Sequence, residues 1–373
     1  DHRDLHSFPT RRSSDLRNSM KRIILTGGGT AGHVTPNIAL VPKLKEKGYD
    51  IQYIGSYDGI ERKLIEDLKI PYYGIASGKL RRYFDIKNFS DPFRVIKGYG
   101  QAVRLMKKLK PSVVFSKGGF VAVPVVMAAK HCHIPVVIHE SDLTPGLANK
   151  LSIPSATKVC CNFPETISHI PDGKAVLTGS PIRQELLKGN RLKALDFCSF
   201  TADKPVLLVI GGSQGSVIVN DSIRGILPEL LKTFQVIHLC GKGKLDPTLN
   251  YMDGYVQYEY IKDELADLFA LADICVSRAG ANAICELLAL RKPNLLIPLS
   301  ANASRGDQIL NAESFERQGF SMVLSEEELA PSILLPAIQK LYDHRSDYIA
   351  AMEKSQQGDA ISTIIQLIED ASL

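Results

Sequence analysis

The sequence has no tryptophan, no pair of cysteines in C-x-x-C spacing, and no long apolar run. Its longest wholly apolar run, residues 120–129, has ten residues and contains Pro124, whereas a membrane-spanning helix needs about 20. The seven cysteines are at positions 132, 160, 161, 198, 240, 275 and 285, and several lie in apolar runs. We therefore expect no membrane span, no structural metal, and buried thiols kept reduced in a reducing cytosol.

A further absence concerns the first glycine-rich loop. Residues 27–32, GGGTAG, fit the spacing G-x-G-x-x-G and follow the apolar run 22–25, as in a dinucleotide-binding turn. Such a unit places an acidic residue about 20 positions further on, at the end of the second strand, to bind the ribose hydroxyls. Here the predicted second strand, 51–54, is followed by Gly-Ser at 55–56, and Asp50 precedes it. An NAD-dependent oxidoreductase is disfavoured unless an acidic residue from elsewhere takes that place.

The composition indicates an ordinary globular protein, because its 373 residues are 45% hydrophobic and 23% charged. That length accommodates two α/β domains of roughly 150 to 200 residues each. Residues 1–19 are polar, lack the apolar core of a signal peptide, and precede Met20 and the first predicted strand. We expect them to be a tag or a sequencing artefact outside the fold.

A strand followed by a glycine loop occurs twice in the chain. The apolar strand 206–210 leads into GGSQG at 211–215, about half the chain after the first such loop. The other predicted strands are 51–54, 113–115, 136–138, 176–178, 236–239, 274–277 and 295–298, and helical stretches alternate with them. This alternation predicts two Rossmann-like α/β domains with parallel sheets. We place the boundary between residues 182 and 183 and expect the ligand between the domains, where strand ends and helix N-termini face each other.

The net charge of +5 is unevenly distributed along the chain. Residues 20–182 carry 23 Lys and Arg against 12 Asp and Glu, whereas residues 183–373 carry 18 against 25. Segment 79–110 has ten basic and two acidic residues interleaved with Tyr and Phe. This pattern favours an anionic membrane surface, where each Lys or Arg contributes about 1 kcal/mol. A solvated helix face is an equally good interpretation, and nucleic acid is a poorer third.

Each glycine loop is accompanied by a polar side chain. His33 follows the first loop and is expected in the first turn of a helix, where the positive end of the helix dipole disfavours imidazolium. A neutral ring there could serve as a base, although a cap or spacer role fits the position equally. In the second loop, Ser213 and the backbone N–H groups could hold a phosphate. A tight strand–helix turn would need the same glycines, and the two interpretations are compatible.

Segment 277–290, SRAGANAICELLAL, predicts a strand end, a glycine turn, and a helix with Asn282 as its N-cap. Glu286 is the only charged residue on an otherwise apolar face of this helix. A carboxylate in that place needs partners, such as the hydroxyls of a ribose. The alternative is a salt bridge to Arg291 or Lys292.

Polar residues also close two further strands. His139, Glu140, Ser141 and Asp142 follow the strand 136–138, and four polar groups at such a place are better explained by a site than by packing. The sequence RGDQ at 305–308 follows the strand 295–298, where sugar hydroxyls could be bound. Neither set contains a helical H-x-x-x-H or a group of thiolates, so we predict no metal site.

Taken together, these motifs closely resemble the MurG family of bacterial glycosyltransferases. They are TGGGTAGHVTP, FSKGGFVAVPV, IHESDLTPGLANK, GSPIR, GGSQGS, YEYI, SRAGANAICELLAL and SRGDQILNA, in the family's order and spacing. That family moves N-acetylglucosamine from UDP-GlcNAc to undecaprenyl-diphosphate-linked N-acetylmuramyl-pentapeptide, converting lipid I into lipid II for peptidoglycan synthesis, cell shape and division. The resemblance implies the GT-B fold, two Rossmann-like domains facing across a cleft. It implies that residues 20–182 bind the acceptor and face the membrane, and that residues 183–345 bind UDP-GlcNAc. Residues 346–373 would include a helix that returns toward the first domain.

The resemblance also implies roles for individual residues. His33 would be the catalytic base, and Glu140 an acceptor-side or assisting carboxylate. The donor-binding residues would be Thr30, Ala31, Gly32, Arg183, Ser213, Gln214, Ile261, Ala281, Asn282, Glu286 and Gln308. Within this set, Arg183 and Ser213 would bind the diphosphate, Ile261 the uracil, Glu286 the ribose, and Gln308 the transferred sugar. Asp142 departs from the family, many of whose members have asparagine there.

The implied chemistry is an inverting single displacement that uses no metal or other cofactor. The acceptor's 4-hydroxyl would lose its proton to His33, while Arg183 and helix N-termini stabilise the departing UDP. The implied partners are UDP-GlcNAc, the lipid-linked acceptor, an anionic membrane surface and cell-wall synthesis proteins, with peripheral attachment to the cytoplasmic side of the cell membrane. Two alternatives stay open: a UDP-sugar transferase with another acceptor, such as diacylglycerol, and a catalytically silent nucleotide-sugar or lipid-binding module.

Overall fold

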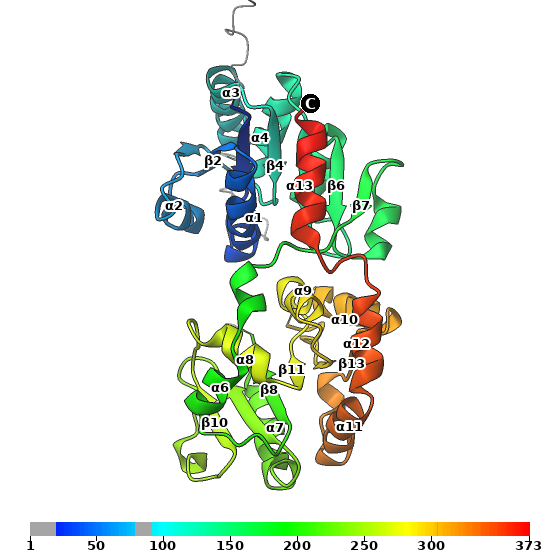
Figure 1. The fold of residues 1–373 in the computed structure, drawn as a ribbon. Coiled ribbons are helices and arrows are strands. Elements are labelled where there is room, and N and C mark those ends of the chain that lie inside the picture. The colour runs from blue at the N-terminus through cyan, green and yellow to red at the C-terminus, as the bar shows by residue number, and fades with distance from the viewer. Residues whose placement is uncertain (1–19, 79–90, 213, 304) are drawn as a thin grey trace, which may run out of the picture.

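The computed structural model describes residues 20–78, 91–212, 214–303 and 305–373, and its core is two separate parallel sheets (Figure 1). The first sheet has seven strands in the order β3-β2-β1-β4-β5-β6-β7. Its strands are β1 (Arg22–Thr26), β2 (Asp50–Ser56), β3 (Tyr72–Ile75), β4 (Val113–Ser116), β5 (Val136–Glu140), β6 (Lys158–Cys161) and β7 (Ala175–Leu177). The order reverses between β1 and β4, which is where α/β sheets of this kind bind ligands.

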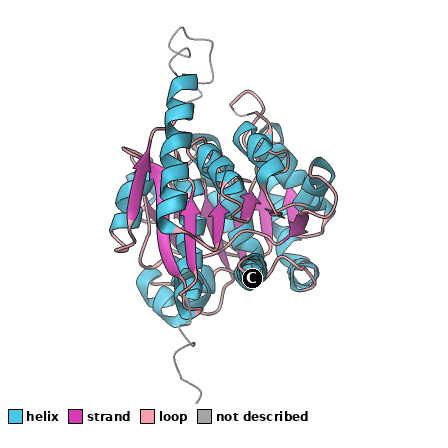
Figure 2. Cartoon of the chain, turned by 90° about the horizontal axis from the view of Figure 1, so that it is seen from above, coloured by secondary structure: helices cyan, strands magenta, loops and turns pink. Residues whose placement is uncertain are grey.

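Helices cover both faces of the first sheet, as the view along the molecule shows (Figure 2). They are α1 (Thr35–Glu46), α2 (Ile60–Glu66), α3 (Asp91–Leu109), α4 (Ala122–His131) and α5 (Leu147–Ser152). Strand β1 shows how the sequence divides them. Ile23 and Leu25 belong to the core that includes α1, whereas Ile24 belongs to the core that includes α3 and α4. Because successive side chains of a strand point to opposite faces, a continuous apolar run fits a sheet covered on both sides.

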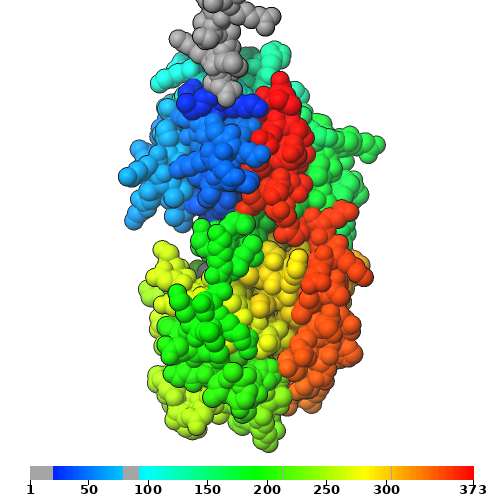
Figure 3. Space-filling view, viewed as in Figure 1, coloured from blue at the N-terminus to red at the C-terminus, as the bar shows by residue number. Residues whose placement is uncertain are grey.

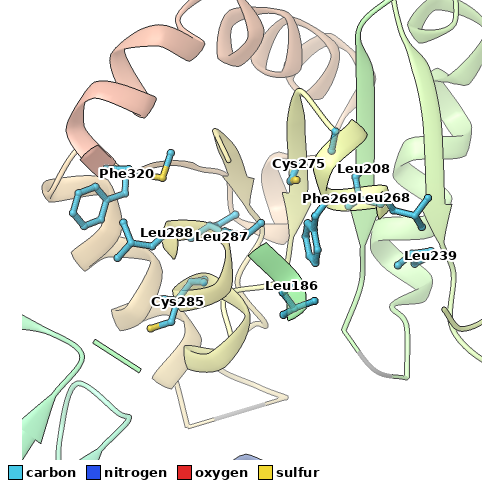
Figure 4. Packing of buried hydrophobic residues seen from close by; sticks show 14 of the residues in the cluster. Leu186, Leu208, Leu239, Leu268, Phe269, Cys275, Cys285, Leu287, Leu288 and Phe320 are labelled. Atoms are coloured by element: carbon cyan, nitrogen blue, oxygen red, sulfur yellow. The ribbon is translucent and has the colours of Figure 1, made fainter. Parts of the chain in front are cut away.

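The second sheet repeats this arrangement with six strands in the order β10-β9-β8-β11-β12-β13. Its strands are β8 (Val206–Ile210), β9 (Gln235–Leu239), β10 (Tyr255–Tyr258), β11 (Ile274–Ser277), β12 (Asn294–Leu296) and β13 (Ser321–Val323). The helices are α6 (Arg191–Cys198), α7 (Val217–Leu230), α8 (Leu265–Leu271), α9 (Ala281–Ala289), α10 (Asp307–Arg317) and α11 (Pro331–Asp343). One core joins Leu208 to Leu268, Phe269 and Leu287 on one face of this sheet (Figure 4).

The C-terminal segment contacts both sheets in turn. Helix α12 (Arg345–Glu353) contributes Met352 to the core of the second sheet. Helix α13 (Ala360–Ala371) packs against α1, β4 and β5, with Ile364 and Ile368 fully buried in the first core. The chain therefore crosses between the sheets after α12, and this segment runs along one side of the molecule (Figure 3).

Both sheets are parallel and doubly wound, so the predicted fold class is confirmed. In the part of the chain that the structure describes, no helix is both long enough and apolar enough to cross a membrane.

Candidate active site at the facing strand ends

The first glycine loop packs directly on the loop that follows β4. Gly27 and Gly29 have φ values of 151° and 88°, which favour glycine. The N–H of Gly28 donates to the carbonyl oxygen of Gly118 at 3.3 Å. A Cβ on Gly119 would lie 2.3 Å from the carbonyl oxygen of Gly28. The two backbones can approach this closely only because both loops lack side chains, and the next residues, Thr30 and Ala31, are left exposed.

His33 lies in the short 3-10 turn Ala31–His33, directly before α1. Its Nδ1 atom is 3.0 Å from the carbonyl oxygen of Gly28 and 3.1 Å from the hydroxyl of Thr30. Burial, and next the charge of Lys117, lowers the pKa of His33. The ring is thus neutral near pH 7, and with the Nδ1 hydrogen donated to Gly28, Nε2 keeps a free lone pair. This geometry suits a general base.

Lys117, directly after β4, is a charged residue of the site that sequence reasoning did not select. Its side chain is almost fully buried, and its Nζ donates to the hydroxyl of Ser141. Burial lowers the pKa of Lys117 to about 8, against the opposing effects of Glu140 and Asp142. The sequence did contain a signal for this residue, namely a lysine directly after an apolar strand and before two glycines. A lysine buried at such a strand end needs polar partners, which indicates a site.

Glu140, the last residue of β5, organises the loop that follows it. One carboxylate oxygen accepts the N–H of Asp142 at 2.7 Å, and the other accepts the side-chain amide of Asn149 at 2.7 Å and the N–H of Gly146 at 3.3 Å. Burial, and next the charge of Asp142, raises the pKa of Glu140 to about 7. Glu140 thus fixes the shape of this loop and has a pKa at which it can exchange a proton near neutral pH.

Asp142 lies on the side of the first sheet that faces the second one. Burial raises the pKa of Asp142, and the next cause is the charge of Asp307, the first residue of α10. The two carboxylates come from different sheets. The loop after β5 and the start of α10 are therefore close enough for their charges to interact across the space between the sheets.

The second glycine loop follows β8 and leads into α7. Ser213 lies outside the described residues, while Gln214 is exposed and its carbonyl oxygen accepts a hydrogen bond from Lys244 at 2.6 Å. Ser216 caps α7 by accepting the N–H of Val219 at 3.3 Å. A backbone turn of this kind at the start of a long helix can hold an anionic group.

Arg278, directly after β11, is a second residue that sequence reasoning did not select. Its guanidinium donates to the hydroxyl of Ser216 at 2.7 Å and to the carbonyl oxygen of Ile297 at 3.0 Å, and it pairs with Glu326 at 2.8 Å. These contacts join the second glycine loop to the end of β12. The signal in the sequence was an arginine at a strand end, but its partners are distant along the chain.

Helix α9 begins one residue before the predicted N-cap, so the prediction for Asn282 was wrong. Gly280 is the N-cap, in extended backbone and without a side-chain bond, and Ala281 begins the helix, since glycine also serves as an N-cap. Asn282 instead faces the other sheet: its side-chain nitrogen lies 3.3 Å from the position that a Cβ on Gly32 would occupy. The second half therefore approaches the glycine loop that carries His33.

Glu286 lies one turn further along α9, and burial raises its pKa to about 7 while Arg183 opposes the shift. Neither of the partners considered from the sequence pairs with it. Arg291 lies 3.7 Å from Glu353, and Lys292 donates to the carbonyl oxygen of Ala272 at 2.8 Å. Glu286 therefore lies near Arg183. The sequence analysis assigned both residues to the same ligand, UDP-GlcNAc.

Gln308, in the first turn of α10, is held by backbone groups. Its side-chain oxygen accepts the N–H of Leu299 at 3.0 Å and that of Ala279 at 3.3 Å. This fixes the amide so that its NH₂ group is the part able to donate to a ligand. Ile261, three residues after β10, is partly buried against the core of the second sheet.

A nicotinamide site would have an acidic residue at the carboxyl end of β2 that binds the ribose, and Asp50 does not take that place. Asp50 lies at the opposite end of β2 and pairs with Arg22 at 2.5 Å. A different acid, Glu61 of α2, lies at the carboxyl end of β2 and accepts the N–H of Ser56 at 3.0 Å and that of Gly29 at 3.4 Å. An acidic residue from elsewhere does reach the loop, but its oxygens bind the backbone of the protein. Within the described ranges, no group of three or more His, Cys, Asp or Glu could hold a metal ion.

A cavity of about 950 Å³ adjoins His33 on the first half of the molecule. Its walls are the first glycine loop, the loop between β2 and α2, the end of β3, residues 119–121 after β4, and two basic residues of α3, Arg94 and Lys97. Its size and its mixture of polar and apolar walls suit an organic ligand with anionic groups.

Two Rossmann-type sheets with polar strand ends facing each other form the architecture of GT-B glycosyltransferases, and similarity to known proteins identifies the class. Residues 23–161 match the glycosyltransferase family 28 N-terminal domain, and residues 206–368 match the glycosyltransferase family 28 C-terminal domain. The chain therefore belongs to glycosyltransferase family 28 and, within it, to the MurG transferases.

The most informative relatives are named UDP-N-acetylglucosamine--N-acetylmuramyl-(pentapeptide) pyrophosphoryl-undecaprenol N-acetylglucosamine transferase. The protein of Lachnospira eligens is 69% identical over 95% of this chain and 100% of its own length. That of Lachnoclostridium phytofermentans is also 69% identical, with the same coverage. Among solved structures, MurG of Acinetobacter baumannii superposes with a TM-score of 0.74 at 27% identity, covering 94% of this chain and 99% of that one. The calicheamicin glycosyltransferase CalG4, with a TM-score of 0.65 and 17% identity over 94% of this chain and 98% of its own, shares the fold.

Proposed function

We propose that this chain transfers N-acetylglucosamine from UDP-GlcNAc to the 4-hydroxyl of undecaprenyl-diphosphate-linked MurNAc-pentapeptide, turning lipid I into lipid II. The observation that carries the proposal is the approach of Asn282 to Gly32, because it brings the half with the second glycine loop against the loop of His33. The relatives at 69% identity over their whole length carry this activity in their names.

In the proposed reaction, His33 takes the proton of the acceptor's 4-hydroxyl. The oxygen forms its bond to the anomeric carbon as the bond from that carbon to the β-phosphate oxygen of UDP breaks, which inverts the configuration. The lowered pKa of His33 and its Nδ1 contact with Gly28 support this role. Glu140 shapes the acceptor side through its bonds to Asp142 and Asn149 and assists proton transfer.

The donor binds mainly to residues 183–345. The exposed guanidinium of Arg183, the second glycine loop with Ser213 and Gln214, and the N-terminus of α7 receive the diphosphate. Glu286 binds the ribose, Ile261 the uracil, and Gln308 the transferred sugar, while Thr30, Ala31, Gly32, Ala281 and Asn282 close around the donor at the cleft. Because fixed groups of the protein stabilise the departing charge, we expect turnover without a divalent cation.

The acceptor binds to residues 20–182, with its sugar and diphosphate in the cavity beside His33. Arg94 and Lys97 supply positive charge to that cavity. On the same helix, Phe93 and Ile96 are 76% and 67% exposed. Apolar and basic side chains together suit an anionic membrane surface, where the lipid tail of the acceptor would lie. We therefore propose peripheral attachment at the cytoplasmic face of the cell membrane.

The test is UDP release from UDP-GlcNAc in EDTA, with and without a short-chain analogue of the lipid-linked muramyl-pentapeptide. Release that depends on this acceptor supports the proposal and its metal independence. Release that depends instead on diacylglycerol would point to the other transferase, and donor binding without any release would point to a binding module.

A further inference from the structure

Glu61 is a buried carboxylate enclosed by glycines. Its side chain is fully buried, although it lies in the first turn of α2 and acidic residues are mostly exposed. A Cβ would lie 2.5 Å from its carboxylate if added to Gly28 and 2.1 Å if added to Gly59. A Cβ on Gly55 would lie 2.9 Å from its Cγ. Two loop glycines, Gly28 and Gly59, thus leave the space that the carboxylate occupies, and Gly55 in β2 leaves room for both Glu61 and Tyr72.

The carboxylate of Glu61 joins the two loops through hydrogen bonds. One oxygen accepts the N–H and the hydroxyl of Ser56, at 3.0 and 2.5 Å, and the other accepts the N–H of Gly29 at 3.4 Å. Ser56 ends β2, whereas Gly29 belongs to the loop after β1. Glu61 therefore joins the glycine loop to the end of the second strand at Gly29, in addition to the hydroxyl of Tyr53 in β2, which donates to the carbonyl oxygen of Gly27 at 2.6 Å.

The same loop orients the proposed base. Gly28 packs its Cα against the carboxylate of Glu61, and its carbonyl oxygen lies 3.0 Å from Nδ1 of His33. The charged groups that act on His33 are Lys117, which lowers its pKa, and Glu61, which raises it. Asp58, Arg94 and Lys97 line the same cavity.

The surroundings of Glu61 itself contain few charges. Tyr53 and Tyr72 pack nearby, and burial raises the pKa of both phenols, with a further contribution from Glu61. The guanidinium of Arg62 lies over the ring of Tyr72, 5.7 Å from its centroid, and pairs with Glu66. Two neutral phenols and His33 are thus titratable groups that interact electrostatically with this carboxylate.

We propose that Glu61 is a positioning residue of the transferase: by holding Gly28 and Gly29 in place, it keeps Nδ1 of His33 as the donor and Nε2 free for the acceptor hydroxyl. This rests on the proposed function, since it assigns Glu61 a part in the work of His33. Removing its negative charge also removes an influence that favours the protonated ring.

The test is the substitution Glu61→Gln, with Glu66→Gln as the matched control on the same helix. Glu66 is 49% exposed and pairs only with Arg62 among the described ion pairs. We expect E61Q to lower kcat about 10-fold or more with little change in the KM for UDP-GlcNAc, and E66Q to leave both unchanged. In E61Q the acid limb of kcat/KM moves to lower pH.

A second measurement reports on His33 without turnover. The imidazole titration and tautomer are followed by NMR in histidine-labelled protein, and the signal is assigned with His33→Gln. E61Q should lower the pKa of His33 and reduce the Nδ1–H tautomer relative to E66Q. An unchanged pKa and tautomer in E61Q would overturn the proposal. Failure of the proposed function would show differently, as wild-type protein that releases no UDP in response to acceptor.

A further variant covers the case in which E61Q does not fold. Glu61→Asp keeps the charge but shortens the reach by one carbon, so it cannot bind Ser56 and Gly29 together. We expect kcat to fall while the pKa of His33 stays closer to the wild-type value than in E61Q. Folded E61D with wild-type kcat would overturn the proposal.

Discussion

The Nζ atom of Lys117 donates a hydrogen bond to the hydroxyl of Ser141, which joins the ends of the neighbouring strands β4 and β5 through a buried cation. The charge of Lys117 acts on both proposed proton-transfer groups, because it lowers the pKa of His33 and that of Glu140. The buried cation thus favours a neutral base and an ionised carboxylate.

Replacing Lys117 with methionine should therefore shift the pH dependence of activity. Without the cation the pKa of His33 rises, so the ring stays protonated to a higher pH. Since the base must be neutral, we expect the acid limb of kcat/KM to move to higher pH, with the largest loss of activity at pH 6. The measurement is kcat/KM from pH 5.5 to 9. The control is Ser141→Ala, which removes the hydrogen bond but keeps the charge; an equal displacement in that variant would contradict the electrostatic explanation.

Binding of UDP should depend on the protonation of Glu286. Burial raises the pKa of Glu286 to about 7, and the carboxylate form is the better acceptor for the ribose hydroxyls. Affinity for UDP should then fall as the pH drops below 7. Glu286→Gln should weaken binding about 10- to 100-fold at pH 8, the effect of one charge-assisted hydrogen bond, and should flatten the pH dependence.

Isothermal titration calorimetry with UDP at pH 6, 7 and 8 provides this measurement. Glu353→Gln is the control, because Glu353 is 51% exposed and lies beside Arg291 at the end of the same half. A pH dependence of UDP binding that persists in E286Q would assign the titrating group elsewhere.

The sequence predicts the centre of both sheets better than their edges. The strands beside the switch points, such as 206–210 and 274–277, are continuous apolar runs covered by helices on both faces, and their predicted bounds agree with the structure. Two strands depart from this rule, because the inner strand β6 was not predicted and the edge strand β7 was. The outer strands β3, β10 and β13 were also not among the strands predicted from apolar runs. They lie at sheet edges and are only partly buried, so their sequences contain Tyr, Gln and Ser and lack the apolar signal.

One short motif was enough to select His33 after its glycine loop, and the structure places its ring beside Gly28 and Thr30, while its role as the base stays a prediction. The roles of Lys117 and Arg278 were not predictable, because each depends on partners from another strand end, Ser141 for one and Ser216 for the other. Asn282 shows the same limit. Its pattern suggested a local cap, but the fold turns it toward Gly32 of the other half.

Membrane attachment should depend on the exposed end of α3. Phe93→Ser with Ile96→Ser removes two apolar side chains that are 76% and 67% exposed. We expect co-sedimentation with vesicles containing anionic lipid to fall at least 10-fold, because burying such side chains contributes about 1.5 to 3 kcal/mol each. Leu192→Ser is the control, since Leu192 is 74% exposed on the second half. Arg81 and Arg82, in the same basic stretch, lie outside the described residues. Undiminished vesicle binding by the double variant would place the membrane surface elsewhere.

Helix α13 should stabilise the first sheet, although it comes from the end of the chain. Ile364 is fully buried among residues of α1 and the first sheet. Ile364→Ala should therefore lower the free energy of unfolding by about 2 to 5 kcal/mol, through lost burial and the cavity left behind. The matched control is Ile333→Ala in α11, because Ile333 is 42% exposed and its loss should cost below about 1 kcal/mol. In thermal melts with and without UDP, I364A should lower the transition even when UDP stabilises the second half. An I364A transition equal to that of I333A would mean that α13 contributes no stability to the first sheet.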